Sequence, residues 1–285
     1  MALPGGGVMT ISLVGSPTVA TNVTSLSVSP SAVGNLLVII TSGSATITTP
    51  SGGGVTTWSG SNYKPSFYAN GLYSGVVTAV GAATITLSAM SDVIVLEFTG
   101  GGAGTWGSNT GGSGYQTASG TATATGYGTP VSAGQLMVGG IANQSSAIAG
   151  STSGFTYATE ATALAAWGVA PSTASQQATA SQSASGRSAG QIGFWAFTPA
   201  PTYTVTFNAN GGSGSMSAES STIPMTLTAN TFTRGGYTFA GWNTVAGGGG
   251  TAYADGATYN TAASVTLYAQ WVANPSSNFF AFMGG

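Results

Sequence analysis

Charged side chains are the first candidates for chemistry in this chain, and they are scarce. The 285 residues include three basic side chains, five acidic ones, no histidine and no cysteine. Histidine is the side chain that exchanges protons near neutral pH without a shifted pKa, so acid–base catalysis lacks its usual residue. The acids are scattered and give no metal-ligand spacing. We therefore expect a protein that is not an enzyme and that holds no cofactor or metal. The five acids are Asp92, Glu97, Glu160, Glu219 and Asp255.

Asp92 and Glu97 are the only two acids close enough in sequence to suggest a pair of glycosidase carboxylates. They flank the apolar run Val93–Leu96, which is typical of a buried strand. Successive side chains of a strand point to opposite faces, so a separation of five residues places the two carboxylates on opposite sides. We expect that they do not act as a pair.

Two short motifs resemble parts of catalytic sites. Residues 102–107 match the pattern G-x-G-x-x-G of dinucleotide-binding loops, but neither a helix pattern nor a ribose-binding acid follows them. Ser61 and Lys64 match S-x-x-K, but Pro65 opposes the helix that would bring the two side chains together. We interpret both motifs as ordinary loop or strand segments.

The overall composition is that of a folded protein with an almost uncharged surface. Hydrophobic residues make up 42% of the chain and aromatic residues 10%, which is enough to bury real cores. Three basic residues cannot neutralise a phosphate backbone, so we expect no nucleic-acid partner. A surface of uncharged polar groups repels little, which favours a homo-oligomer or a larger assembly.

The apolar runs are short. The strongest, Leu36–Ile40 and Val93–Leu96, fall far below the roughly 18 residues of a membrane-spanning helix, so we expect no membrane span. Residues 1–7 carry neither the basic nor the apolar region of a signal peptide, which predicts no standard secretion.

Alternation of apolar and polar residues predicts strands along most of the chain. It is clear in Tyr203–Phe207 and Val265–Trp271, and turn pairs such as Asn70-Gly71 and Asp255-Gly256 separate the strands. We therefore predict an all-β protein. The alanine-rich segment 160–167 fits a helix and a strand about equally well, and the pattern leaves both open.

An internal repeat divides the first 200 residues. The sequence SAVGNLLV at 31–38 recurs as VSAGQLMV at 131–138, with Gly34 and Gly134 one hundred residues apart. Each copy is typical of a tight turn that leads into a buried central strand. The two related halves fit either the two sheets of one sandwich or two small stacked domains.

These patterns predict the domain organisation. We expect a jelly-roll-like β-sandwich over residues 1–198, a proline-rich linker at 199–202, a small module at 203–272 and an apolar tail at 273–285. The layout of residues 8–198, a turn, a buried strand, a glycine-rich loop and a closing aromatic strand, resembles β-sandwich domains in virion and tail proteins of phages of Gram-positive and actinobacterial hosts.

Four ordered motifs distinguish the module. They are YTVTFNANGG at 203–212, FTRGGYTFAGWNT at 232–244, YADGATY at 253–259 and VTLYAQW at 265–271. This set resembles the B-repeat of internalin-type surface proteins, also called the Listeria-Bacteroides repeat. The resemblance implies a small β-grasp-like module that serves as a stalk or weak adhesive unit and not as an enzyme. A single copy implies an outward-facing decoration. The run 247–250 is glycine where that family's turn often carries an acid.

The C-terminal tail carries large apolar side chains without a fold of its own. Exposed apolar groups on a tail are typical of a docking peptide, although such a tail can also fold back onto its own module. We expect it to anchor the protein to a neighbouring subunit. The docking residues are Phe279, Phe280, Phe282 and Met283.

Together these features favour a non-enzymatic structural protein of a phage virion, exposed on the particle exterior. It would be a minor tail or tail-tip protein or a capsid decoration, with other virion proteins and a host-surface glycan or protein as partners. The alternative is a bacterial cell-surface adhesin or a carbohydrate-binding protein. The missing signal-peptide pattern counts against the adhesin.

Overall fold

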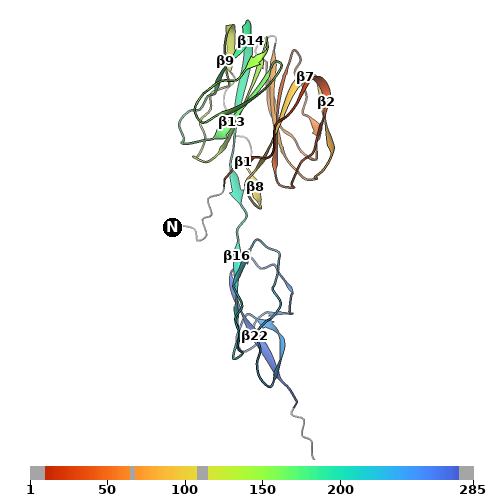
Figure 1. Ribbon diagram of the computed structural model, residues 1–285, viewed down its shortest axis with the longest axis vertical. Coiled ribbons are helices and arrows are strands. Elements are labelled where there is room, and N and C mark those ends of the chain that lie inside the picture. The colour runs from red at the N-terminus through yellow and green to blue at the C-terminus, as the bar shows by residue number, and fades with distance from the viewer. Residues whose placement is uncertain (1–9, 65–67, 108–114, 276–285) are drawn as a thin grey trace, which may run out of the picture. The chain divides into compact units, whose positions relative to one another are not determined.

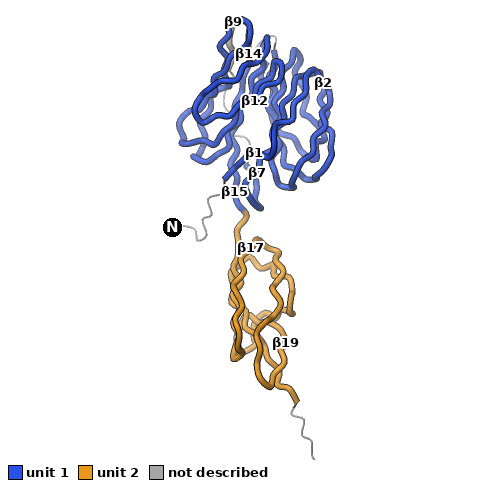
Figure 2. Tube along the Cα trace, viewed as in Figure 1, with its two compact units in different colours: residues 1–199 blue, residues 200–285 orange. Residues whose placement is uncertain are grey.

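A computed structural model of the chain describes residues 10–64, 68–107 and 115–275. Within these ranges the protein is all-β, and they contain no helix (Figure 1). The chain forms two compact units, residues 1–199 and residues 200–285 (Figure 2).

The first half of unit 1 forms an antiparallel sheet. Its path is β1-β7-β3-β6-β5, and β2 and β4 also pair with β7. The strands are β1 (Ser12–Leu13), β2 (Thr18–Val28), β3 (Leu36–Gly43), β4 (Ser51–Gly52), β5 (Ser59–Tyr63), β6 (Ala69–Val76) and β7 (Ala83–Thr99).

The second half forms another antiparallel sheet with the path β11-β14-β10-β13-β12, and β9 also pairs with β14. Two further strands, β8 (Gly104–Trp106) and β15 (Phe197–Pro199), pair with each other. The strands of the sheet are β9 (Tyr115–Ala124), β10 (Leu136–Asn143), β11 (Ala147–Ile148), β12 (Thr156–Glu160), β13 (Ala163–Val169) and β14 (Thr179–Trp195).

The two halves share one topology. The order β2-β7-β3-β6-β5 of the first corresponds strand by strand to the order β9-β14-β10-β13-β12 of the second. The repeated turns also bond alike: the N–H of Gly34 donates to Val77 O and that of Gly134 to Ala170 O, both at 2.9 Å. Both glycines have φ values, +91° and +85°, that residues with a side chain rarely adopt. The sequence repeat therefore reflects a duplicated fold.

The duplicated sheets pack face to face over a shared core. Side chains of β3 with even numbers, such as Val38 and Ile40, pack with Leu136, Val138 and Trp195 of the second half. The odd-numbered ones face a separate core within the first half. Unit 1 is thus a sandwich whose halves each have an outer core of their own. Because each half keeps its strands in one sheet, the connectivity differs from that of a jelly roll.

The segment 160–167, which fits both a helix and a strand in sequence, forms a turn and most of β13. This strand lies between β10 and β12 in the sheet. Ala163, Ala165 and Trp167 face the shared core, whereas Leu164 and Ala166 face an outer one. A strand buried on both faces loses the alternation that identifies strands, which explains the ambiguity.

Unit 2 is built on a mixed five-stranded sheet with the order β17-β16-β22-β19-β20. Its central pair, β16 and β22, is parallel, as in a β-grasp fold, and β18 and β21 form a second small sheet. The strands are β16 (Tyr203–Asn208), β17 (Glu219–Ser221), β18 (Met225–Thr226), β19 (Tyr237–Asn243), β20 (Ala252–Tyr253), β21 (Thr258–Tyr259) and β22 (Val265–Ala273).

Trp242 is the centre of the core of unit 2. Its ring is 1% exposed and lies 4.9 Å from the rings of Phe207 and Phe239, centroid to centroid. Phe232 contacts it edge-on at 6.1 Å. Aromatic clusters of this kind contribute more than their buried area alone, which suits a small module.

We predict that residues 200–275 fold on their own, because they hold a complete sheet and an aromatic core. The fragment should show β-type circular dichroism and a single cooperative thermal transition. Trp242→Ala should lower the free energy of unfolding by about 3–5 kcal/mol. A non-cooperative transition in the unsubstituted fragment would contradict this expectation.

Candidate functional site

Asp92 is a buried carboxylate at the contact between the two halves of unit 1. Its Oδ1 accepts the N–H of Asn22 at 3.0 Å. Its Oδ2 accepts the N–H of Thr162 at 3.0 Å and the hydroxyl of the same residue. The Thr162 hydroxyl also lies 2.8 Å from Ser42 Oγ. Oδ1 therefore bonds within the first half, and Oδ2 bonds to the second half.

Glu97 projects from the opposite face of β7, as the spacing predicts. Its Oε1 accepts three hydrogen bonds from the turn before β3: the Ser31 N–H at 2.9 Å, the Ser31 hydroxyl at 2.8 Å and the Asn35 amide at 2.6 Å. Asp92 and Glu97 have no bonding partner in common. The structure thus does not bring them together as a catalytic pair.

The other three acids also accept hydrogen bonds from neutral donors. Glu160 accepts the hydroxyl of Thr21, and Glu219 accepts the Thr228 hydroxyl at 2.8 Å. Asp255 accepts the N–H of Asn230 at 2.7 Å. In the described ranges no group of three or more acids, histidines or cysteines could hold a metal ion.

The two motifs that resemble parts of catalytic sites are structural segments. Ser61 donates to Gln191 Oε1 at 3.0 Å, whereas Lys64 donates to Ser44 O at 2.6 Å, so each has its own partner. Residues 104–106 of the glycine pattern form β8 against β15. The Trp106 ring packs edge-on against Phe197 at 5.0 Å. The pattern therefore forms a short strand paired with a segment distant in sequence, and not a phosphate-binding loop before a helix.

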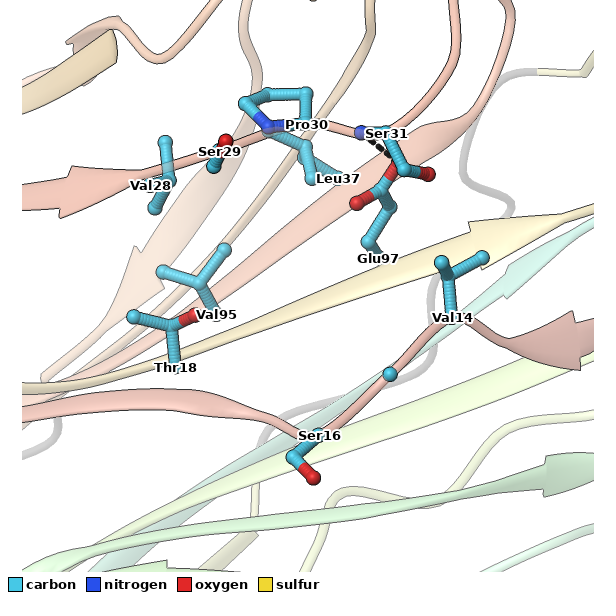
Figure 3. A pocket seen from close by; sticks show the side chains of 11 residues that line it. Val14, Ser16, Thr18, Val28, Ser29, Pro30, Ser31, Leu37, Val95 and Glu97 are labelled. Carbon is cyan, nitrogen blue, oxygen red and sulfur yellow. Dashed lines mark hydrogen bonds between the residues drawn. The ribbon is translucent and has the colours of Figure 1, made fainter. Parts of the chain in front are cut away.

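A cavity of about 310 Å³ lies beside Glu97 in the first half of unit 1 (Figure 3). Valine, leucine and proline side chains form its apolar walls, and serine and threonine hydroxyls lie among them. Figure 3 shows one oxygen of the Glu97 carboxylate beside Ser31 and the other directed toward the space between Leu37 and Val95. The lining residues are Val14, Gly15, Ser16, Thr18, Val28, Ser29, Pro30, Ser31, Leu37, Val95 and Glu97.

The second half of unit 1 has a different side chain at the position that corresponds to Glu97. Leu37 pairs with Glu97, and its counterpart Met137 pairs with Phe194, so a phenyl ring replaces the carboxylate. Phe194 is fully buried. The repeated turn instead bonds to its own Gln135, whose Oε1 accepts the N–H of Val131 at 2.6 Å. The two copies thus stabilise the same turn in different ways.

Unit 2 presents an aromatic and basic surface at one end of its sheet. The Arg234 guanidinium lies 4.0 Å above the centre of the Tyr237 ring, a cation–π contact. Tyr237 is 37% exposed. This exposed pair could contact a partner.

Several residues with clear roles carry no sequence signal. Thr162 and Gln191 bond across the halves, the latter through its Nε2 to Asn70 O at 2.6 Å. Single hydroxyls and amides are common in a chain of this composition, so only contacts distant in sequence reveal them. The predicted docking residues, Phe279, Phe280, Phe282 and Met283, lie outside the described residues.

Comparison with protein families matches residues 203–270 to the Listeria-Bacteroides repeat domain. The C-terminal module is therefore a B-repeat, as its four motifs predict. No curated protein and no solved structure matches the chain. The resemblance of residues 8–198 to phage proteins stays a prediction. In the described ranges there is no helix long and apolar enough to cross a membrane.

We predict that Asp92→Asn destabilises unit 1 by about 2–4 kcal/mol. In the wild type both carboxylate oxygens accept N–H groups, whereas in the variant an amide N–H₂ group would face one of these donors. Denaturant unfolding followed for each unit measures the change. Glu219→Gln in unit 2 is the control and should leave unit 1 unaltered. A loss below about 1 kcal/mol would show that the Asp92 contacts are not stabilising.

We also predict that alkaline pH destabilises both units through buried tyrosines. Burial raises the pKa of Tyr73 above 10.0, although the hydrogen bond from Asn62 opposes this. Burial is the largest cause that raises the pKa of Tyr259, and the charge interaction with the nearby Tyr253 raises it further. Since the folded state favours the neutral phenols, their contribution is complete below pH 10.0 and is lost as pH rises through the higher folded values.

Thermal unfolding between about pH 8 and pH 11.5 tests this expectation. Tyr73→Phe should weaken the alkaline loss in unit 1, and Tyr259→Phe should do so in unit 2. An unchanged alkaline profile in both variants would refute the role of these two phenols.

Proposed function

We propose that this chain is a non-enzymatic structural protein of a phage virion, exposed on the particle as a minor tail or tail-tip protein or a capsid decoration. The observation that carries the non-enzymatic part is the use of the acids. All five accept hydrogen bonds from the chain's own N–H or O–H groups. Carboxylates held in this way act as structural acceptors.

The composition supports a place in an assembly. Charged residues make up 3% of the chain, so like-charge repulsion between neighbouring copies or subunits is weak. Four apolar clusters in the described part of the duplicated sandwich supply a well-packed body, which suits a rigid building block. The layout of residues 8–198 adds the resemblance to virion proteins.

The B-repeat supports an outward, adhesive role for unit 2. In this proposal the surface around Arg234 and Tyr237 contacts a host-surface glycan or protein. The second candidate, a bacterial cell-surface adhesin or carbohydrate-binding protein, is favoured by the match to the Listeria-Bacteroides repeat domain. The two candidates differ in where the chain is found, on particles or on cell walls.

We expect the tail to attach the protein to its particle. Burial of Phe279, Phe280 and Phe282 in a partner contributes on the order of 1.5–3 kcal/mol each, which exceeds the cost of ordering a short peptide. Deletion of residues 278–285 should leave both units folded but abolish copurification with particles. Ser276→Ala with Ser277→Ala is the control and should copurify normally.

Mass spectrometry of purified particles and of cell-wall fractions measures how much of each chain is present in them. Full incorporation of the truncated chain would refute attachment through the tail. Absence of the full-length chain from particles, with recovery from cell walls, would refute the virion proposal in favour of the adhesin.

A further inference from the structure

Glu97 is a preoriented acceptor whose bonds are all on one side. Ser31 and Asn35 place three donors on its Oε1 at 2.6–2.9 Å. These bonds fix the plane of the carboxylate. The second oxygen is then directed into the cavity, and Figure 3 shows it turned toward the space between Leu37 and Val95. A fixed acceptor of this kind binds a donor with little loss of side-chain entropy.

The duplicated half shows that the fold does not need a carboxylate here. In the second half the same turn is bonded by Gln135, and the phenyl ring of Phe194 occupies the position that corresponds to Glu97. A carbon atom on Gly128 would meet that ring at 2.2 Å, so the space around it is filled. The open cavity with a carboxylate is therefore specific to the first half.

The walls of the cavity define the ligand chemistry. Val28, Leu37 and Val95 offer contacts to an aliphatic chain, while Ser16 and Ser29 add hydroxyl oxygens as acceptors. At about 310 Å³ the cavity is near the lower limit for small-ligand sites, which suits a single side chain. A side chain with an aliphatic stem and a positively charged hydrogen-bond donor at its end fits both the apolar walls and the carboxylate.

A compact ammonium fits better than a guanidinium. Arginine prefers two parallel hydrogen bonds to both oxygens of a carboxylate, but Oε1 is already occupied by three donors. Lysine presents three donors from a single point and needs only one carboxylate oxygen. We propose that the Glu97 cavity binds a lysine side chain of a neighbouring protein in the assembly.

The lysine must come from a different protein. Lys64 is the only lysine of this chain, and its ammonium donates to the carbonyl of Ser44. The formal net charge of −2 also favours a basic partner over a second copy of this chain. This inference rests on the proposed role in an assembly and names the chemistry of one contact within it.

The test titrates the full-length chain with Nα-acetyl-lysine N-methylamide, observed by NMR. We expect saturable binding with a Kd on the order of millimolar, and about tenfold weaker binding to Glu97→Gln. Glutamine keeps a carbonyl oxygen for Ser31 and Asn35, so the Glu97→Gln variant should stay folded, with a melting temperature within a few degrees of the wild-type value. Glu219→Gln is the matched control and should bind like the wild type. The neutral analogue Nα-acetyl-norleucine N-methylamide should not bind.

Equal binding by Glu97→Gln, equal binding of the norleucine analogue, or no binding by the wild type would each overturn the inference. Carbodiimide coupling on particles then identifies the source, because a lysine seated against Glu97 forms an amide with it that mass spectrometry can map. Coupling in the wild type but not in Glu97→Gln supports a partner lysine. If the probe does not bind while the chain still copurifies with particles, this inference fails and the proposed function stands.

Discussion

The shared apolar core between β3 and β10 is the contact on which the rest of unit 1 depends. At Gly140 the sheets approach so closely that a carbon atom added there would meet Ile40 at 2.8 Å. Each half alone would leave the apolar face of its central strands exposed to water, which at about 25 cal/mol per Å² is a large cost. The duplication supplies each sheet with its cover.

This close packing determines how the few charges are used. A carboxylate at a buried contact is stable only when its oxygens are bonded, and Asp92 meets that condition through Asn22 and Thr162. Gln191 satisfies the same need for the backbone of Asn70. With the acids engaged in this way, two surfaces are left for the proposed recognition of partners: an aromatic end of unit 2 and a cavity whose single carboxylate has an unbonded oxygen. The proposed roles in assembly and adhesion require no more chemistry than this.

Much of the fold could be predicted from local patterns. The repeat at 31–38 and 131–138 predicts two related halves, and the four motifs over 203–271 predict the B-repeat that the family comparison matches. The candidate site was much less predictable. Ser31, Asn35 and Glu97 meet only because β7 returns beside β3, and nothing in the spacing of these residues indicates a cavity.

Local sequence was enough for four properties: the all-β class, the scarcity of groups that could catalyse a reaction, the duplication and the family of the module. The first two follow from periodicity and composition, the third from the repeated segment and the fourth from the order of the four motifs. None of these signals requires knowledge of contacts. Three other features emerge from the folded chain alone: segment 160–167 contributes a central strand, Asp92 joins the halves, and Glu97 faces a cavity whereas Phe194 fills its counterpart. Each of these depends on partners far away in sequence, and the pairing of distant strands is set by burial of the whole sheet rather than by any local pattern.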